Sequence, residues 1–329
     1  IKSFGDIKYI EAGTYVYEVA EDSSNAETGI TYDGSIWTVT VTVPEGFETP
    51  TVTYSNGKDT PNTVTAEFTN SKYEAETTLG VTKVLSGREF KAGDAWTFTL
   101  AGGTVDTPMP AQTSVTTTAT SGNSQTLTFG KIKYGLADVG KTYTYTITES
   151  GSREGVTNDP NNTRTVTVKV EKGSDGNLVV TKTEPTGGVS FTNTYSAAGE
   201  TELKAEKQLV GREFREGDKW TFTVTCDTQG APLPEHPVIT TGATSGNSET
   251  LDFGKINYTL ADVGTYVYTI TESGSVANVE NDPVATRTVT VTVSDNGNGT
   301  LNVQKTEGAN GLTFTNKYVE GETTLGVTK

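Results

Sequence analysis

Apolar and polar residues alternate one by one along many short runs of the chain, and this pattern predicts β-strands. Between Tyr143 and Glu149, for example, two tyrosines and an isoleucine alternate with threonines. β-Branched and aromatic residues at every second position fit a half-buried pleated strand. No run of apolar residues at helical spacing stands out, and only 33% of the residues are hydrophobic. The pattern therefore predicts an all-β protein built from thin, two-layer β-sandwiches.

Some of these strands carry a polar residue where an apolar one is expected. Lys83, Glu149 and Asn193 each fall on the face that the apolar side chains share, because side chains alternate between the two faces of a strand. A second set repeats the first: Lys207, Glu272 and Asn316. The nearby Lys204 lies on the opposite face and is excluded. Burying even one such group unpaired is expensive, so each set is predicted to meet in a core.

Internal repetition defines the domain organisation. Residues 87–90 (GREF) return at 211–214 and residues 191–193 (FTN) return at 314–316, so the period is 123 to 124 residues. A repeat of this length is a full domain. The sequence predicts the C-terminal half of one β-sandwich, two complete β-sandwiches, and a linker with the first strand of another repeat: residues 1–73, 74–195, 196–318 and 319–329.

The incomplete units keep parts of the polar set. Glu21 and Asn70 stand in the half unit where the complete units have their glutamate and asparagine. Lys329 ends a segment, residues 322–329 (ETTLGVTK), that is identical to residues 76–83. We therefore expect Glu21 and Asn70 to form one partial triad and Lys329 to belong to another.

One reaction uses an amine, an acid and an amide that are buried together. Burial makes a lysine lose its proton more readily, and the neutral amine is a nucleophile. A buried carboxyl group can stay protonated and donate a hydrogen bond to the amide oxygen. Attack of the amine, with the glutamate passing a proton and ammonia leaving, gives an isopeptide bond. The glutamates would be catalytic, and the crosslinks would join Lys83 to Asn193 and Lys207 to Asn316.

The structural alternative is a buried lysine–glutamate ion pair with an asparagine hydrogen bonded beside it. A buried ion pair contributes little to stability and can be replaced by apolar residues. Two complete copies and two partial ones therefore favour the crosslink. It would close a loop of about 110 residues, which is worth roughly 4 to 5 kcal/mol by analogy with a disulfide.

Charge and cysteine content narrow the class of protein. The net charge of −16, from 25 basic and 41 acidic residues, disfavours nucleic acid and anionic membranes as partners. Cys226 is the single cysteine, so no disulfide can form within the chain. The sequence shows no transmembrane run and no signal peptide, and His236 has no partner at metal-ligand spacing. We predict no cofactor, no metal and no membrane insertion.

The same segments carry a family resemblance. Residues 81–100, 129–150, 164–170 and 189–195 are similar to the isopeptide-linkage domain of Gram-positive pilins, of the streptococcal T-antigen major pilin type. This domain is related to the collagen-adhesin B-type repeat. In the family the lysine lies on the first strand, the glutamate on a middle strand and the asparagine on the last. The half unit departs from the pattern, with one extra residue between Asn70 and Tyr73.

The resemblance implies tandem immunoglobulin-like β-sandwiches in an elongated array, forming a structural stalk segment of a bacterial pilus or adhesin. Such a protein is extracellular and anchored to the cell wall, and its partners are neighbouring repeats or pilin subunits. A host ligand would bind at a tip outside these residues. The predicted chemistry is a single turnover within each domain, so the chain is not an enzyme.

Two other functions stay open at this point. The chain could be an adhesive module that binds a host glycan or matrix protein, which outward-facing aromatic residues would favour. It could also be an uncrosslinked immunoglobulin-like spacer of a surface enzyme. Trp96 and Trp220 occupy matching positions and are predicted to lie in the core, whereas the sequence does not decide whether Trp37 is buried.

Overall fold

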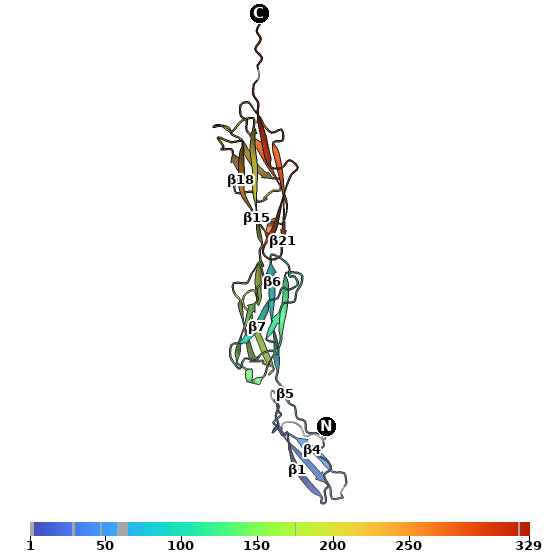
Figure 1. Ribbon diagram of the computed structural model, residues 1–329. Helices are drawn as coiled ribbons and strands as arrows, with labels where there is room; N and C mark the ends of the chain where they lie inside the picture. The colour runs from blue at the N-terminus through green and yellow to red at the C-terminus, as the bar shows by residue number, and fades with distance from the viewer. Residues whose placement is uncertain (1–2, 28–29, 47, 58–64, 175, 322) are drawn as a thin grey trace.

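The computed structural model shows three β units in an elongated row (Figure 1). It describes residues 3–329 apart from 28–29, 47, 58–64, 175 and 322. The described residues contain no α-helix and only two short 3-10 turns, Leu136–Asp138 and Leu260–Asp262. No helix among them is long and apolar enough to cross a membrane. The all-β prediction is confirmed.

The middle unit is a sandwich of two sheets. Its five-stranded sheet has the order β13 (Leu178–Thr183), β12 (Thr163–Lys172), β10 (Thr142–Ser150), β7 (Thr97–Gly102) and β8 (Ser114–Thr116). Its four-stranded sheet has the order β11 (Val156–Thr157), β14 (Ser190–Tyr195), β6 (Ala75–Ser86) and β9 (Ser124–Tyr134). β6 and β14 pair in parallel, and the other neighbouring strands are antiparallel.

The third unit repeats this arrangement strand for strand. Its five-stranded sheet has the order β17 (Val238–Thr240), β16 (Thr221–Cys226), β19 (Gly264–Ser273), β21 (Thr286–Asp295) and β22 (Leu301–Glu307). Its four-stranded sheet has the order β18 (Ser248–Thr259), β15 (Ala198–Val210), β23 (Thr313–Tyr318) and β20 (Val279–Glu280). The first and last strands, β15 and β23, again pair in parallel.

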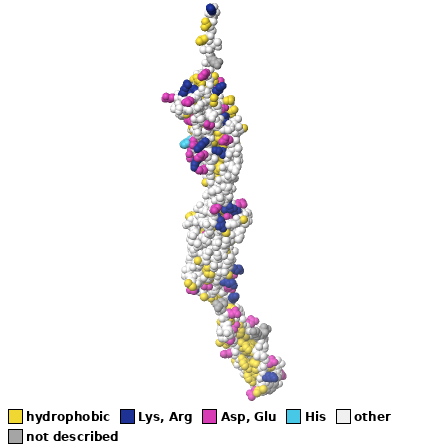
Figure 2. All heavy atoms as spheres, in the orientation of Figure 1, with side chains coloured by type: hydrophobic (Ala, Val, Ile, Leu, Met, Phe, Trp, Pro, Cys, Tyr) yellow, Lys and Arg dark blue, Asp and Glu magenta, His cyan; other side chains and the backbone are white. Residues whose placement is uncertain are grey.

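In the part of the first unit that the structure describes, the strands are counterparts of β10 to β14. Its strands are β1 (Gly13–Ala20), β2 (Ile30–Thr31), β3 (Ile36–Val43), β4 (Thr51–Ser55) and β5 (Ser71–Lys72). β1, β3 and β4 form one sheet, and β2 pairs with β5. Its small core is built on Val39, Val41 and Val43, with half-buried tyrosines around them. Figure 2 shows apolar side chains gathered on one face of this unit.

The tryptophans mark the cores. Trp96 and Trp220 are fully buried, as predicted. Trp96 packs edge-on against Phe90 of the repeated GREF segment, with ring centroids 6.0 Å apart. Trp37 is also buried. It pairs with Val19 in the register where Arg164 pairs with Ile147 in the middle unit, so a tryptophan replaces an arginine at this position.

The junction between the second and third units leaves little freedom. β15 begins at Ala198, three residues after β14 ends at Tyr195, and pairs at once with β18. The turn after β21 docks on the middle unit, where Tyr195 Oη lies 2.6 Å from Asp295 Oδ1 and accepts a hydrogen bond from Gly299 N–H at 3.1 Å. A Cβ on Gly155 would lie 2.5 Å from Gly299. Such contacts resist bending at the joint.

The C-terminal tail forms no strand over residues 323–329, and its side chains are exposed. Glu322, which begins the predicted first strand of a further repeat, lies outside the described residues. The assignment of this tail to a further unit stays a prediction.

Gly87, which follows β6, lies close to the backbone at the end of β14. Its φ is +90°, and a Cβ there would lie 2.2 Å from the carbonyl oxygen of Tyr195. Gly93 also has a φ of +90° but open space around it. Gly93→Ala should cost only the backbone strain, about 1 to 2 kcal/mol, whereas Gly87→Ala should lower the thermal unfolding temperature considerably more. Equal losses in the two variants would show that the Tyr195 contact is unimportant.

Candidate functional site

The strand pairing brings the predicted lysine and asparagine together. β6 and β14 are parallel neighbours, with Lys83 opposite Phe191 and Leu85 opposite Asn193. Lys83 and Asn193 are therefore diagonal neighbours on the inward face of one sheet. Glu149 comes from β10 in the other sheet and faces them across the core. Relative exposures are 0% for Lys83, 4% for Glu149 and 0% for Asn193.

One glutamate oxygen contacts both the amine and the amide in the middle unit. Lys83 Nζ lies 2.8 Å from Glu149 Oε1. Asn193 Nδ2 donates a hydrogen bond to the same oxygen at 3.4 Å. The amine also donates to the carbonyl oxygen of Phe191 at 3.4 Å. The three side chains thus meet at a single atom.

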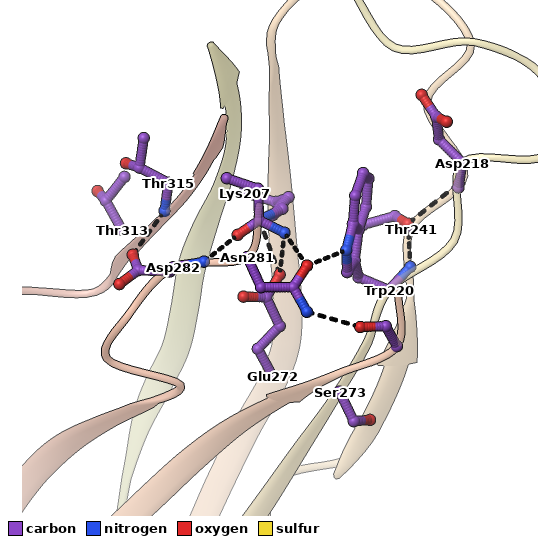
Figure 3. A network of polar contacts seen from close by, with 12 residues as sticks. Lys207, Asp218, Trp220, Thr241, Glu272, Ser273, Asn281, Asp282, Thr313 and Thr315 are labelled. Carbon is purple, nitrogen blue, oxygen red and sulfur yellow. Dashed lines mark hydrogen bonds and ion pairs between the residues drawn. The ribbon is translucent and has the colours of Figure 1, made fainter. Parts of the chain in front are cut away.

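The third unit holds the same arrangement (Figure 3). Lys207 Nζ lies 2.7 Å from Glu272 Oε1, and Asn316 Nδ2 donates to that oxygen at 3.0 Å. The contact between Lys207 and Glu272 is a buried ion pair. Lys204 is exposed and pairs with Glu202 and Asp252 at the surface, in agreement with its exclusion.

The amide oxygen has a different partner from the one that the sequence suggested. Asn193 Oδ1 accepts a hydrogen bond from the backbone N–H of Asp159 at 2.8 Å. Asn316 Oδ1 accepts one from Asp282 N–H, also at 2.8 Å. A backbone N–H can only donate, so it determines which amide atom is the oxygen. The glutamate therefore faces the amide nitrogen instead of the oxygen.

A second asparagine in each unit was missed by the sequence analysis. Asn193 Nδ2 donates to Asn158 Oδ1 at 2.9 Å, and Asn316 Nδ2 donates to Asn281 Oδ1 at 3.1 Å. A signal existed, because both complete units have Asn-Asp-Pro at this place, residues 158–160 and 281–283. It lies in the loop after β11 or β20, where no strand periodicity draws attention to it.

An aromatic ring lies beside the amine in each complete unit. Lys83 Nζ lies 5.1 Å from the ring centroid of Trp96, and Lys207 Nζ lies 4.9 Å from that of Trp220. Burial lowers the pKa of both lysines below the ordinary lysine value, and the contact with the glutamate opposes this shift only in part. The described residues provide no hydrogen-bond partner for Oε2 of Glu149 or Glu272. A buried amine with a lowered pKa is a better nucleophile.

The partial triads are only partly assembled. Asn70 Nδ2 donates to Glu21 Oε1 at 2.7 Å, and Asn70 Oδ1 accepts from Asp33 N–H at 2.9 Å. Asn70 is exposed, and Tyr32 stands where the complete units have their second asparagine. Lys329 is exposed at the C-terminus, at the opposite end of the molecule from the first unit (Figure 1).

The remaining candidate residues are a histidine and a cysteine. The described residues contain no cluster of three or more His, Cys, Asp or Glu side chains that could hold a metal ion. His236 is exposed, and Cys226 is a half-buried free thiol.

Comparison with known proteins identifies the family. The model of the Spy0128-like isopeptide containing domain matches residues 1–74, 79–196 and 203–319. The chain belongs to this family. The resemblance found in the sequence is thereby confirmed, and no curated protein matches the chain.

Several solved structures are similar to this member of the Spy0128-like family. They include the major pilin protein T-13 of Streptococcus pyogenes (18% identity, 75% of this chain and 99% of that one, TM-score 0.27). The Streptococcus pyogenes major pilin has 17% identity over 74% of this chain and 99% of its own, with a TM-score of 0.24. A mutant of the shaft pilin SpaA from Lactobacillus rhamnosus GG has 13% identity over 75% of this chain and 100% of its own, with a TM-score of 0.19. TM-scores of this size carry no argument by themselves.

The lowered pKa of Lys83 predicts a pH dependence in a variant of this Spy0128-like domain that keeps a free amine. In Asn193→Leu the unfolded chain binds the lysine proton more tightly than the folded one. The free energy of unfolding should therefore rise with pH, from the lowered pKa up to the ordinary lysine value of about 10.4. Denaturant titrations at several pH values would measure this rise.

The control is the double variant Lys83→Met/Asn193→Leu, which lacks the titrating group. Its unfolding free energy should change less over the same range, and the difference between the two curves isolates Lys83. A stability of the single variant that falls with rising pH, relative to the control, would contradict the lowered pKa.

Proposed function

We propose that this chain is a structural stalk segment of a bacterial surface pilus or adhesin whose complete domains lock themselves with Lys–Asn isopeptide bonds. One observation carries the proposal: in both complete units a single buried glutamate oxygen contacts the lysine amine and the asparagine amide together. Membership of the Spy0128-like isopeptide family supports it.

The reaction balances without any external reagent. The neutral Nζ of Lys83 adds to Cγ of Asn193, and the electron pair of the carbonyl bond moves onto Oδ1. Glu149 takes a proton from Nζ and passes one to Nδ2. The electron pair on Oδ1 then re-forms the carbonyl bond as the Cγ–Nδ2 bond breaks, and Nδ2 leaves as ammonia. An amine and a primary amide thus give a secondary amide and ammonia. Because the fold holds both reactants in contact, proximity supplies much of the rate.

The mechanical consequence follows from the strand order. Load that enters the middle unit along β6 reaches Lys83, crosses the bond to Asn193, and leaves through β14 into β15. The loops and the other sheet lie outside this path. The docked turn at Tyr195 stiffens the joint to the next unit. A row of such units transmits tension without unfolding.

The partners and location follow from the same proposal. The chain would act outside the cell, in a pilus or adhesin fixed to the cell wall, with neighbouring repeats or pilin subunits as partners. Its chemistry is limited to one turnover inside each domain. An adhesive role would favour exposed aromatic side chains, and among the described residues only Phe4 is an exposed aromatic.

A digest tests the crosslink residue by residue. Trypsin treatment of the unfolded chain should release one branched peptide that joins the strands of Lys83 and Asn193, and another for the third unit. Glu149→Gln should abolish the first and keep the second, because it removes the proton carrier of the middle unit only. The matched control is Glu202→Gln, which alters a surface lysine pair and should leave both. Survival of the first branched peptide in Glu149→Gln would contradict the role of this glutamate.

Pulling on single molecules tests the stalk function. The wild-type chain should show no extension step from residues 83–193, because the covalent bond between Lys83 and Asn193 keeps the residues between them from extending under load. Glu149→Gln should add a step of roughly 360 to 400 Å for this unit, the length of about 110 extended residues. A wild-type chain that releases this length at moderate force would rule out a load-bearing lock.

A further inference from the structure

Two consecutive residues hold the reacting amide by both of its polar ends. Asn158 Oδ1 accepts from Asn193 Nδ2 at 2.9 Å, and the backbone N–H of Asp159 donates to Asn193 Oδ1 at 2.8 Å. In the third unit the matching distances, from Asn281 and Asp282, are 3.1 and 2.8 Å. We call each such pair the amide holder. With both ends fixed, the carboxamide cannot rotate.

The asparagine of the holder is itself locked in one orientation. The indole N–H of Trp96 donates to Asn158 Oδ1 at 3.3 Å, and Asn158 Nδ2 donates to the carbonyl oxygen of Gly151 at 2.7 Å. An indole N–H can only donate, so the atom it meets is an oxygen. Asn158 must therefore offer an acceptor to the amide nitrogen. Figure 3 shows the same chain of contacts from Trp220 through Asn281.

The backbone half of the holder is anchored to the strand that carries the amide. Asp159 Oδ2 accepts from Thr192 N–H at 2.9 Å and pairs with Arg164 Nη2 at 2.8 Å. Thr192 directly precedes Asn193. The donor N–H and the amide it contacts are therefore fixed relative to each other by a short ring of bonds.

The first unit keeps the backbone contact of the holder and lacks its asparagine. Asp33 N–H donates to Asn70 Oδ1 at 2.9 Å, as in the complete units. Tyr32 replaces the asparagine, and Asn70 Nδ2 contacts Glu21. The loop backbone alone thus supplies the oxygen contact. The nitrogen contact needs an asparagine, and both complete units have one.

We propose that the amide holder is part of the catalytic machinery: Asn158 and Asn281 fix the departing nitrogen, and the N–H groups of Asp159 and Asp282 stabilise the oxyanion. This inference rests on the proposed crosslink. As Lys83 Nζ adds to the amide carbon, negative charge gathers on Oδ1, where the N–H already points. Because one N–H of Asn193 Nδ2 is bound to Asn158 Oδ1, the nitrogen stays oriented toward Glu149. Glu149 can then protonate it.

The holder lies nearer to solvent than the amide that it contacts. Asn193 and Asn316 are fully buried, whereas Asn158 is half-buried and Asn281 is exposed. The partly exposed asparagine of the holder contacts the nitrogen that leaves.

Two substitutions at Asn158 distinguish this role from simple packing. Asn158→Asp keeps an oxygen that accepts from both Trp96 and Asn193 but loses the bond to Gly151. Asn158→Leu keeps the volume and loses the acceptor. The wild type and both variants are translated without cells, quenched in denaturant at intervals and digested, and the branched peptide is quantified by mass spectrometry. The untouched third unit is the internal control.

We expect the Lys83–Asn193 bond to form roughly tenfold to a hundredfold more slowly in Asn158→Leu, the scale of a misplaced reactant. In Asn158→Asp its rate should stay within about threefold of wild type, as expected where the acceptor is kept. The Lys207–Asn316 bond should form at the wild-type rate in both. A packing role predicts the opposite order, because aspartate places a charge beside the Gly151 carbonyl.

A wild-type rate in Asn158→Leu, or a slower reaction in Asn158→Asp than in Asn158→Leu, overturns the inference while the proposed crosslink stands. Absence of both branched peptides from the wild type overturns the proposed crosslink itself. If the middle unit of Asn158→Leu loses its resistance to protease, it is unfolded, and Trp96→Phe is used in its place. That variant removes the indole N–H and should also slow the bond, and an unchanged rate there counts against the holder.

Discussion

The parallel pairing of the first and last strands is the constraint on which the rest of each unit depends. β6 and β14 are far apart in sequence, yet they are neighbours in register. This pairing puts Lys83 and Asn193 on one inward face, and the opposite sheet then brings Glu149 over them. A parallel pair cannot be joined by a tight turn. The whole sandwich is, in effect, the connection that allows these two strands to meet.

Burying a lysine and a glutamate together is a poor way to stabilise a core, because desolvation offsets most of their attraction. Here the arrangement makes sense as a reactant state. Conversion of the amine into an amide removes the lysine charge from the core and leaves a covalent link in its place. The desolvation that lowers the pKa of Lys83 thus favours the reaction that ends the cost of burying it.

Strand periodicity made the fold and the inward triads predictable, since a period of two residues assigns each side chain to a face. It could not predict contacts made by loops. Asn158 and the N–H of Asp159 lie between β11 and β12, where no such rule applies, so the expectation that the glutamate would bond the amide oxygen was wrong. Trp37 stayed undecided for a related reason. Its burial depends on strand register, which puts it where the middle unit has Arg164.

The central claim is that both complete triads react, and the mass of the intact chain tests it most directly. Electrospray measurement of the denatured, full-length chain should give a mass lower than that of the sequence by two molecules of ammonia, one for Lys83–Asn193 and one for Lys207–Asn316. A mass that matches the sequence would contradict the account and leave two buried ion pairs in place of two covalent locks.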